Sequence, residues 1–143
     1  MKNNAIRMFL ALGAACLYGS ALDAQTNHLL SAKVPFDFQA SGQTFAAGKY
    51  VLRGHGSFGI PSIQSAASGH TSFIAGAGRT LTQEGPPRLV FHCYTGNGCF
   101  LSEIRPANGE GMSLSMSRVE KEIANGERPV EMTSVSVALR TAD

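Results

Sequence analysis

The strictest pattern in the chain is an alternation of apolar and polar residues in LLSAKVPFDFQA, residues 29–40. Every second residue from Leu30 to Ala40 is apolar, and the residues between them are polar except for Pro35. Because successive side chains of a strand point to opposite faces, this period of two places all the apolar side chains on one face. We therefore predict a β-strand here. Pro35 has no N–H, so we expect it at a sheet edge or a bulge.

Further short segments with strand-like patterns follow, separated by glycine-rich turns. After an SGQ turn, GKYVLR places Tyr50 and Leu52 on one face, and later candidates are FGIPSIQS, HTSFIA, LVFHC, CFLSE and PVEMTSVSVAL. Short strands and turns at regular spacing are typical of sandwiches and barrels rather than of βαβ folds. The sequence thus predicts a mainly β, single-domain antiparallel sandwich or small barrel.

Two segments depart from simple alternation. In PVEMTSVSVAL, Val130 and Met132 share one face whereas Val135 and the apolar residues after it share the other, which predicts a bulge near Thr133. In SMSRVEKEIANG, a serine and a glutamate have capping-box spacing, and Asn-Gly is a typical helix stop. We predict one short helix over about residues 118–125, which must pack on the sheet because two turns are not stable alone.

The two cysteines of LVFHCYTGNGCFLSEI, residues 89–104, lie on either side of a typical hairpin turn. The turn places Cys93 opposite Cys99. Continuing the same register places Leu89 opposite Glu103, while His92 projects from the other face. Opposed residues can have Cβ atoms close enough for a disulfide, which forms readily in an oxidising compartment. We predict that Cys93 and Cys99 form a disulfide.

The N-terminal residues have the pattern of a secretory signal. Lys2 and Arg7 precede an apolar run, and small residues lead to a cleavage position after Ala24. We predict a signal peptide over residues 1–24 and a secreted β-domain over residues 25–143, periplasmic or extracellular, without a transmembrane span once the signal is removed. Lipid anchoring through Cys16 is disfavoured, because a glycine stands where a lipoprotein box has a branched apolar residue.

The charge of the chain argues against some classes of binding partner. The predicted signal contains two of the 12 basic residues and one of the 10 acidic ones, so the remainder is close to neutral. There is no basic cluster of the kind that binds nucleic acid or anionic lipid. The expected partner is an unknown ligand or a component of the cell envelope, and not a nucleic acid.

Motifs that suggest catalysis or cofactors are weak. GHGSFG, residues 54–59, matches GxGxxG, but IPSIQS follows it in place of a helix, so we expect a hairpin loop. No histidines have HxH or HExxH spacing, and there is no G-x-S-x-G elbow. We therefore predict no catalytic, cofactor-binding or metal-binding residue. If the protein were an enzyme, the candidates would be His55, His70, His92, Asp37 and Glu103.

Three patches resemble a family of small secreted β-rich proteins of soil bacteria. VPFDFQASGQTFAAGKYVL resembles the family's PFxFxxxGxxLPAGxYxV opening, LVFHCYTGNGCFLSEI its LVFxRYGxxYFLSxI block, and SMSRVEKE its PxSxxExE patch. Here Phe45-Ala46 stands where the family has Leu-Pro, and the two cysteines replace other residues. The resemblance implies an exported β-rich domain and nothing catalytic.

These features favour a non-catalytic exported β-domain that acts as a binding or envelope-associated module. The alternative is a small secreted hydrolase or metal-dependent enzyme, which would require several of the candidate side chains to meet in one cleft.

Overall fold

The computed structural model describes residues 29–54, 60–75, 77–81, 85–107 and 110–142. The predicted signal peptide, Cys16, His55 and most of GHGSFG lie outside these residues. The elements are β1 (Leu30–Val34), β2 (Phe38–Ala40), β3 (Gln43–Phe45), β4 (Gly48–Arg53), β5 (Ser62–Ser65), β6 (Thr71–Phe73), β7 (Ala77–Leu81), β8 (Arg88–Tyr94), β9 (Gly98–Arg105), β10 (Glu110–Leu114), α2 (Arg118–Ala124), β11 (Met132–Ala138) and β12 (Arg140–Thr141).

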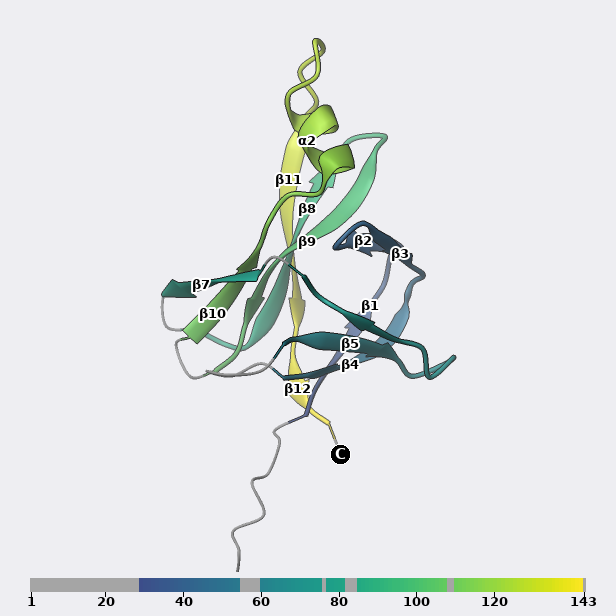
Figure 1. The fold of residues 1–143 in the computed structure, drawn as a ribbon, viewed down its shortest axis with the longest axis vertical. Coiled ribbons are helices and arrows are strands. Elements are labelled where there is room, and N and C mark those ends of the chain that lie inside the picture. Colours follow the sequence, from purple (N-terminus) through teal and green to yellow (C-terminus); the bar gives the residue numbers. More distant parts are fainter. Residues whose placement is uncertain (1–28, 55–59, 76, 82–84, 108–109, 143) are drawn as a thin grey trace, which may run out of the picture.

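The strands form two sheets (Figure 1). Sheet A has the order β12-β1-β4-β5-β6, and sheet B has the order β11-β8-β9-β10-β7. The β2–β3 hairpin joins sheet B through a parallel pairing of β2 with β9. The structure is mainly β, which confirms the predicted fold class. Because the two sheets do not close into a barrel, the arrangement is consistent with a sandwich.

The predicted strand over residues 29–40 is two strands in different sheets, so the prediction of one continuous strand is wrong. Residues 35–37 separate β1 in sheet A from β2 in sheet B. Pro35 cannot continue the ladder because it has no N–H, and the Asp37 carboxylate accepts a hydrogen bond from the Ala47 amide at 2.7 Å. The predicted apolar face survives the break, because Ala32, Val34, Phe38 and Ala40 are all buried.

Aromatic rings join the two sheets around Phe38. Its ring stacks on that of Phe45 with ring centroids 5.1 Å apart. It makes T-shaped contacts with the rings of Tyr50 and Phe91, with centroids 5.3 and 5.2 Å away. The half-buried ring of Phe36 also packs edge-on against Phe91. Of the aromatic residues in the PFxF and AGxY patches, Phe38 and Tyr50 therefore belong to the core, and Phe36 packs against it.

The β8–β9 hairpin follows the predicted register only near its turn. Cys93 lies opposite Cys99 as expected, but Leu89 lies opposite Ile104 and not opposite Glu103. The register shifts by one residue because Ser102 is an extra residue on β9, a β-bulge. The bulge places Ile104 in the core with Leu89. Without it the Glu103 carboxylate would face the core, where burying a charge is costly.

The predicted bulge near Thr133 is absent. β11 pairs with β8 in one unbroken register from Met132 to Ala138. Val135 and Val137 pack against the core, whereas Met132 is on the outer face and 46% exposed. The change of parity in the sequence thus reflects one exposed methionine and not a backbone irregularity.

The predicted helix is confirmed as α2. Ser117 is its N-cap, with its side chain accepting a hydrogen bond from the Glu120 amide, and Asn125 is its C-cap. Within the described parts of the chain, no helix has the length and apolar character needed to cross a bilayer.

Truncating Phe38 to alanine should lower the free energy of unfolding by about 3–5 kcal/mol, because the fully buried ring leaves a cavity between the sheets. Phe73→Ala is the matched control, since that side chain is 67% exposed and its loss should change stability by about 0.5 kcal/mol or less. Chemical denaturation of both variants measures the difference. Equal losses would contradict a core centred on Phe38.

Candidate functional site

Titratable side chains gather on the outer face of sheet B, on β8. His92 and Tyr94 alternate along the strand with Phe91 and Cys93, which pack against the core. The two faces of the strand thus separate the imidazole from the thiols. This agrees with the prediction that His92 and the cysteines point in opposite directions.

Helix α2 covers this outer face and buries Glu120, which is only 4% exposed. The Glu120 amide donates to the Ser117 hydroxyl at 3.1 Å, which is one half of a capping box. The carboxylate turns toward the sheet, where it accepts a hydrogen bond from the Tyr94 hydroxyl at 3.2 Å. A residue that the sequence places in a helix cap therefore also attaches the helix to the sheet.

His92 lies beside the same carboxylate. Its Nδ1 atom is 3.6 Å from Glu120 Oε1, which is too far for a hydrogen bond. That nitrogen is buried and has no hydrogen-bond partner among the described residues, although the side chain as a whole is 24% exposed. The cross-strand neighbours of His92 are Phe100 on β9 and Ser134 on β11. The imidazole thus adjoins one buried carboxylate, and the two side chains are not part of a group of three possible metal ligands within the described residues.

The electrostatics of this cluster act on Tyr94. Burial raises the pKa of its hydroxyl above the ordinary value, and the nearby Glu120 charge and the hydrogen bond to it raise the pKa further. Tyr94 also packs against Phe100 with ring centroids 5.8 Å apart. Tyr94 is therefore a hydrogen-bond donor to Glu120 over the physiological pH range.

The other sequence-derived candidates lie in separate places. Asp37 accepts from a backbone amide between β1 and β2. Glu103 pairs with Arg105 on β9, and His70 lies exposed in the loop before β6. Within the described ranges, no three His, Cys, Asp or Glu side chains are placed to hold a metal ion. Of the four candidates that the structure describes, only His92 belongs to the cluster under α2, and His55 lies outside the described residues.

Sequence reasoning missed two members of the cluster, Tyr94 and Glu120. A signal for Tyr94 exists, because it is two residues from His92 and so must share its face of the strand. For Glu120 the sequence indicates a cap, and nothing local shows that the carboxylate would face β8.

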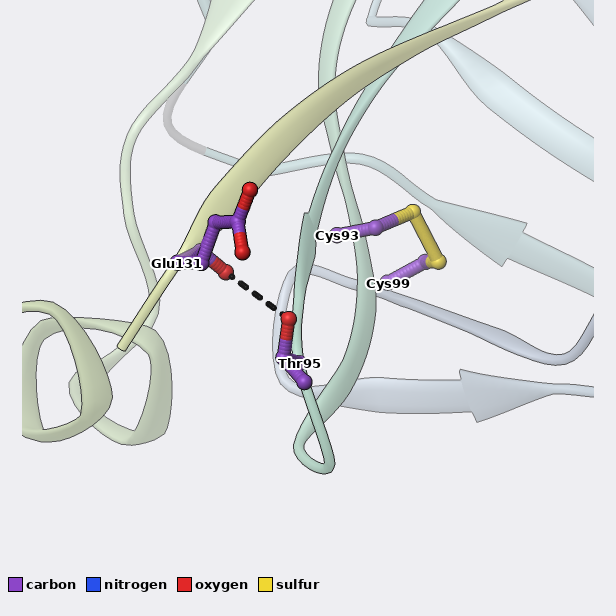
Figure 2. Close-up of a disulfide and its surroundings, with 4 residues drawn as sticks. All are labelled: Cys93, Thr95, Cys99 and Glu131. Atoms are coloured by element: carbon purple, nitrogen blue, oxygen red, sulfur yellow. Dashed lines mark hydrogen bonds between the residues drawn. A yellow bond between two sulfur atoms is a disulfide. The ribbon is translucent and has the colours of Figure 1, made fainter.

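The disulfide lies at the end of the hairpin, on the core side. Cys93 and Cys99 are bonded, with Cα atoms 4.0 Å apart, as predicted (Figure 2). On the side of the hairpin that faces β11, the Thr95 amide and hydroxyl both donate to the Glu131 carbonyl, at 3.1 and 3.4 Å. The disulfide therefore joins β8 to β9 beside the turn, and two hydrogen bonds hold the turn to the residue before β11.

Comparison of the chain with models of protein families, with curated proteins and with solved structures finds no match. The resemblance to small secreted bacterial proteins therefore stays a prediction.

Replacing Tyr94 by phenylalanine should lower the free energy of unfolding by about 1–3 kcal/mol, because the buried Glu120 carboxylate loses its donor. The variant should also lose less of its unfolding free energy than the parent protein does as the pH becomes alkaline. A raised pKa means that the folded state holds the proton more tightly, so this contribution is complete below the ordinary pKa of 10.0 and is lost as the pH rises through the folded value.

The measurement is chemical denaturation between neutral pH and pH about 11. The pKa of Tyr50 is also raised, mainly by burial and then by Asp37, so Tyr50→Phe is the control that leaves the Tyr94 contribution in place. An alkaline profile of Tyr94→Phe identical to the parent would contradict the Tyr94–Glu120 interaction.

Removing the disulfide with the pair Cys93→Ser and Cys99→Ser should cost about 2 kcal/mol of unfolding free energy, the value expected for closing so small a loop. Reduction of the parent protein should give the same loss in equilibrium denaturation. A loss well above this value in both samples would indicate a role beyond closing the hairpin.

Proposed function

We propose that the protein is an exported β-domain that acts as a binding or envelope-associated module. The observation that carries the proposal is the Cys93–Cys99 disulfide between directly opposed residues of a hairpin. Such bonds persist in oxidising compartments, outside the reducing cytosol. The signal-like pattern of residues 1–24 supports the same compartment.

The partners of the polar side chains support binding over catalysis. Asp37 holds a backbone amide, Glu103 pairs with Arg105, and Glu120 attaches α2 to Tyr94. Each of these contacts stabilises the fold, and the groups lie on different elements. Catalysis by a triad requires its nucleophile, base and orienting group within hydrogen-bond reach of one another.

A small secreted hydrolase is the second candidate, and one observation favours it. His92 lies beside the buried Glu120 carboxylate, and a carboxylate next to an imidazole is the arrangement that orients a general base in hydrolases. In this reading His92 would be the base and Glu120 its orienting group, while the nucleophile would be a substrate water or hydroxyl.

Native mass spectrometry of the protein exported from its own signal tests the proposal. We expect a chain that begins at Gln25, has a mass two hydrogens below that of its reduced form, and carries no metal. A mass that retains residues 1–24, or free thiols after export, would contradict the assignment of the compartment. A bound metal ion would move the enzyme alternative forward.

Turnover assays separate the two candidate functions. With a panel of ester, peptide and glycoside substrates, we expect no activity that depends on His92. The control is His70→Ala, because His70 is exposed and lies away from the cluster. Activity that is lost in His92→Ala and kept in His70→Ala would establish the hydrolase in place of the binding module.

A further inference from the structure

Strand β11 forms one edge of sheet B. It pairs with β8 on one side, and no other strand of the described chain pairs with it. Figure 1 shows it as the long yellow strand that runs between the level of α2 and the C-terminal end. At seven residues it is the longest edge strand among the described residues. An edge strand presents unpaired backbone N–H and C=O groups that can pair with another chain.

Hydrogen bonds just beyond the two ends of β11 show which of its residues face β8. The Thr95 amide donates to the Glu131 carbonyl at 3.1 Å, and the Leu139 amide donates to the Pro87 carbonyl at 3.0 Å. In an antiparallel pair, successive residues direct their backbone groups alternately toward the partner strand and away from it. The odd-numbered residues from 131 to 139 therefore bond to β8.

The even-numbered residues direct their N–H and C=O groups to the open edge. These residues are Met132, Ser134 and Ser136. Ala138 has the same direction, but it lies two residues before Arg140, where the chain already pairs with β1. The open edge thus offers three donors and three acceptors at intervals of two residues, which is the pattern that an antiparallel strand satisfies.

The sequence and register of β11 carry none of the features that usually prevent pairing, although β1 lies near this strand and pairs with the residues that follow it. The β11 sequence MTSVSVA has no charge, proline or glycine, and its register with β8 has no bulge. The other edges differ. β3 and β6 have three residues each, β12 has two including Arg140, and β7 contains Gly78 and Arg79.

We propose that β11 pairs antiparallel with β11 of a second copy of this chain, about a two-fold axis at Ser134, so that the two B sheets become continuous. In this register Ser134 lies opposite Ser134 of the second copy, and Met132 lies opposite Ser136. All three outward-facing residues then exchange their hydrogen bonds, and the pairing is self-complementary as a two-fold interface requires.

A second copy fits this edge because the pairing is self-complementary, and the charges do not oppose it. No like charges meet along the paired segment, because β11 contains no ionised side chain. The formal net charge of the whole chain is only +2, so long-range repulsion between copies is small. This inference goes beyond the proposed function and does not depend on it, because the edge exists whatever the compartment or ligand.

A charge exchange at the two-fold axis tests the pairing in the oxidised, exported protein. Ser134→Lys and Ser134→Glu each place like charges directly opposite one another, and each should raise the dimer dissociation constant by about tenfold or more. Mixing the two variants places opposite charges together and should restore dimers. Sedimentation equilibrium across a wide range of protein concentration measures all three samples and the parent.

Ser136→Lys is the matched control, with the same chemistry on the same face of the same strand. Its two charges would lie four residues apart along the interface, about 13 Å, which exceeds the screening length of about 8 Å at physiological salt. It should therefore weaken the dimer much less than Ser134→Lys. Thermal unfolding of each variant verifies that the fold is intact.

Amide hydrogen exchange in the unsubstituted protein provides a test that needs no variant. The amides of Ser134 and Ser136 should exchange slowly at high concentration and faster on dilution, whereas the Val135 amide, which faces β8, should not depend on concentration. A parent that is monomeric at every concentration would overturn the proposal. So would a dimer that Ser134→Lys leaves intact, or one that Ser136→Lys disrupts equally.

Discussion

The alternation of side chains on β8 is the constraint on which the rest of the structure depends. One face of this strand supplies Leu89, Phe91 and Cys93 to the core, and the other supplies His92 and Tyr94 to the cluster under α2. β8 also pairs with β9 and β11 along almost its whole length. A shift of one residue would exchange the two faces, which would put an imidazole in the core and the disulfide outside.

Two devices allow the neighbouring strands to keep their core faces. The bulge at Ser102 restores Ile104 to the core after the hairpin turn, and the break at residues 35–37 lets one alternating segment serve two sheets. The aromatic rings around Phe38 then connect β2, β4 and β8 across the interior. The helix adds no core residue; it attaches to the outer face through the Tyr94–Glu120 hydrogen bond. The sandwich is thus stabilised mainly by one apolar layer and locally by polar contacts at its outside.

Much of this organisation could be predicted from sequence, because it depends on local patterns. The apolar alternation identifies Val34 and Phe38 as core residues, the turn between Cys93 and Cys99 identifies the disulfide, and the spacing of Ser117 and Glu120 identifies the helix. The bulge predicted near Thr133 is wrong because Met132 is exposed, whereas the other two errors have one common cause. Bulges and breaks, at Ser102 and at residues 35–37, are decided by which sheet a strand must join, and no local pattern reports that.

The candidate site was less predictable than the fold. His92 was among the sequence-derived candidates, but its companions Tyr94 and Glu120 were not, since Glu120 is 26 residues from Tyr94 along the chain. The sequence also did not predict that β11 is an edge strand. A strand of serines and valines has the same sequence pattern at the edge of a sheet as between two other strands. Only the strand order distinguishes the two cases.

The sequence by itself determined which face of residues 30–40 is buried, where the hairpin turns, and that its cysteines can bond, because these depend on neighbours within a few residues. The tertiary structure alone decided which strands lie at the edges, where the register shifts, and that a helix-cap glutamate lies against His92 and Tyr94. These features depend on contacts between segments far apart in the chain, whose geometry arises only when the two sheets pack around the aromatic core.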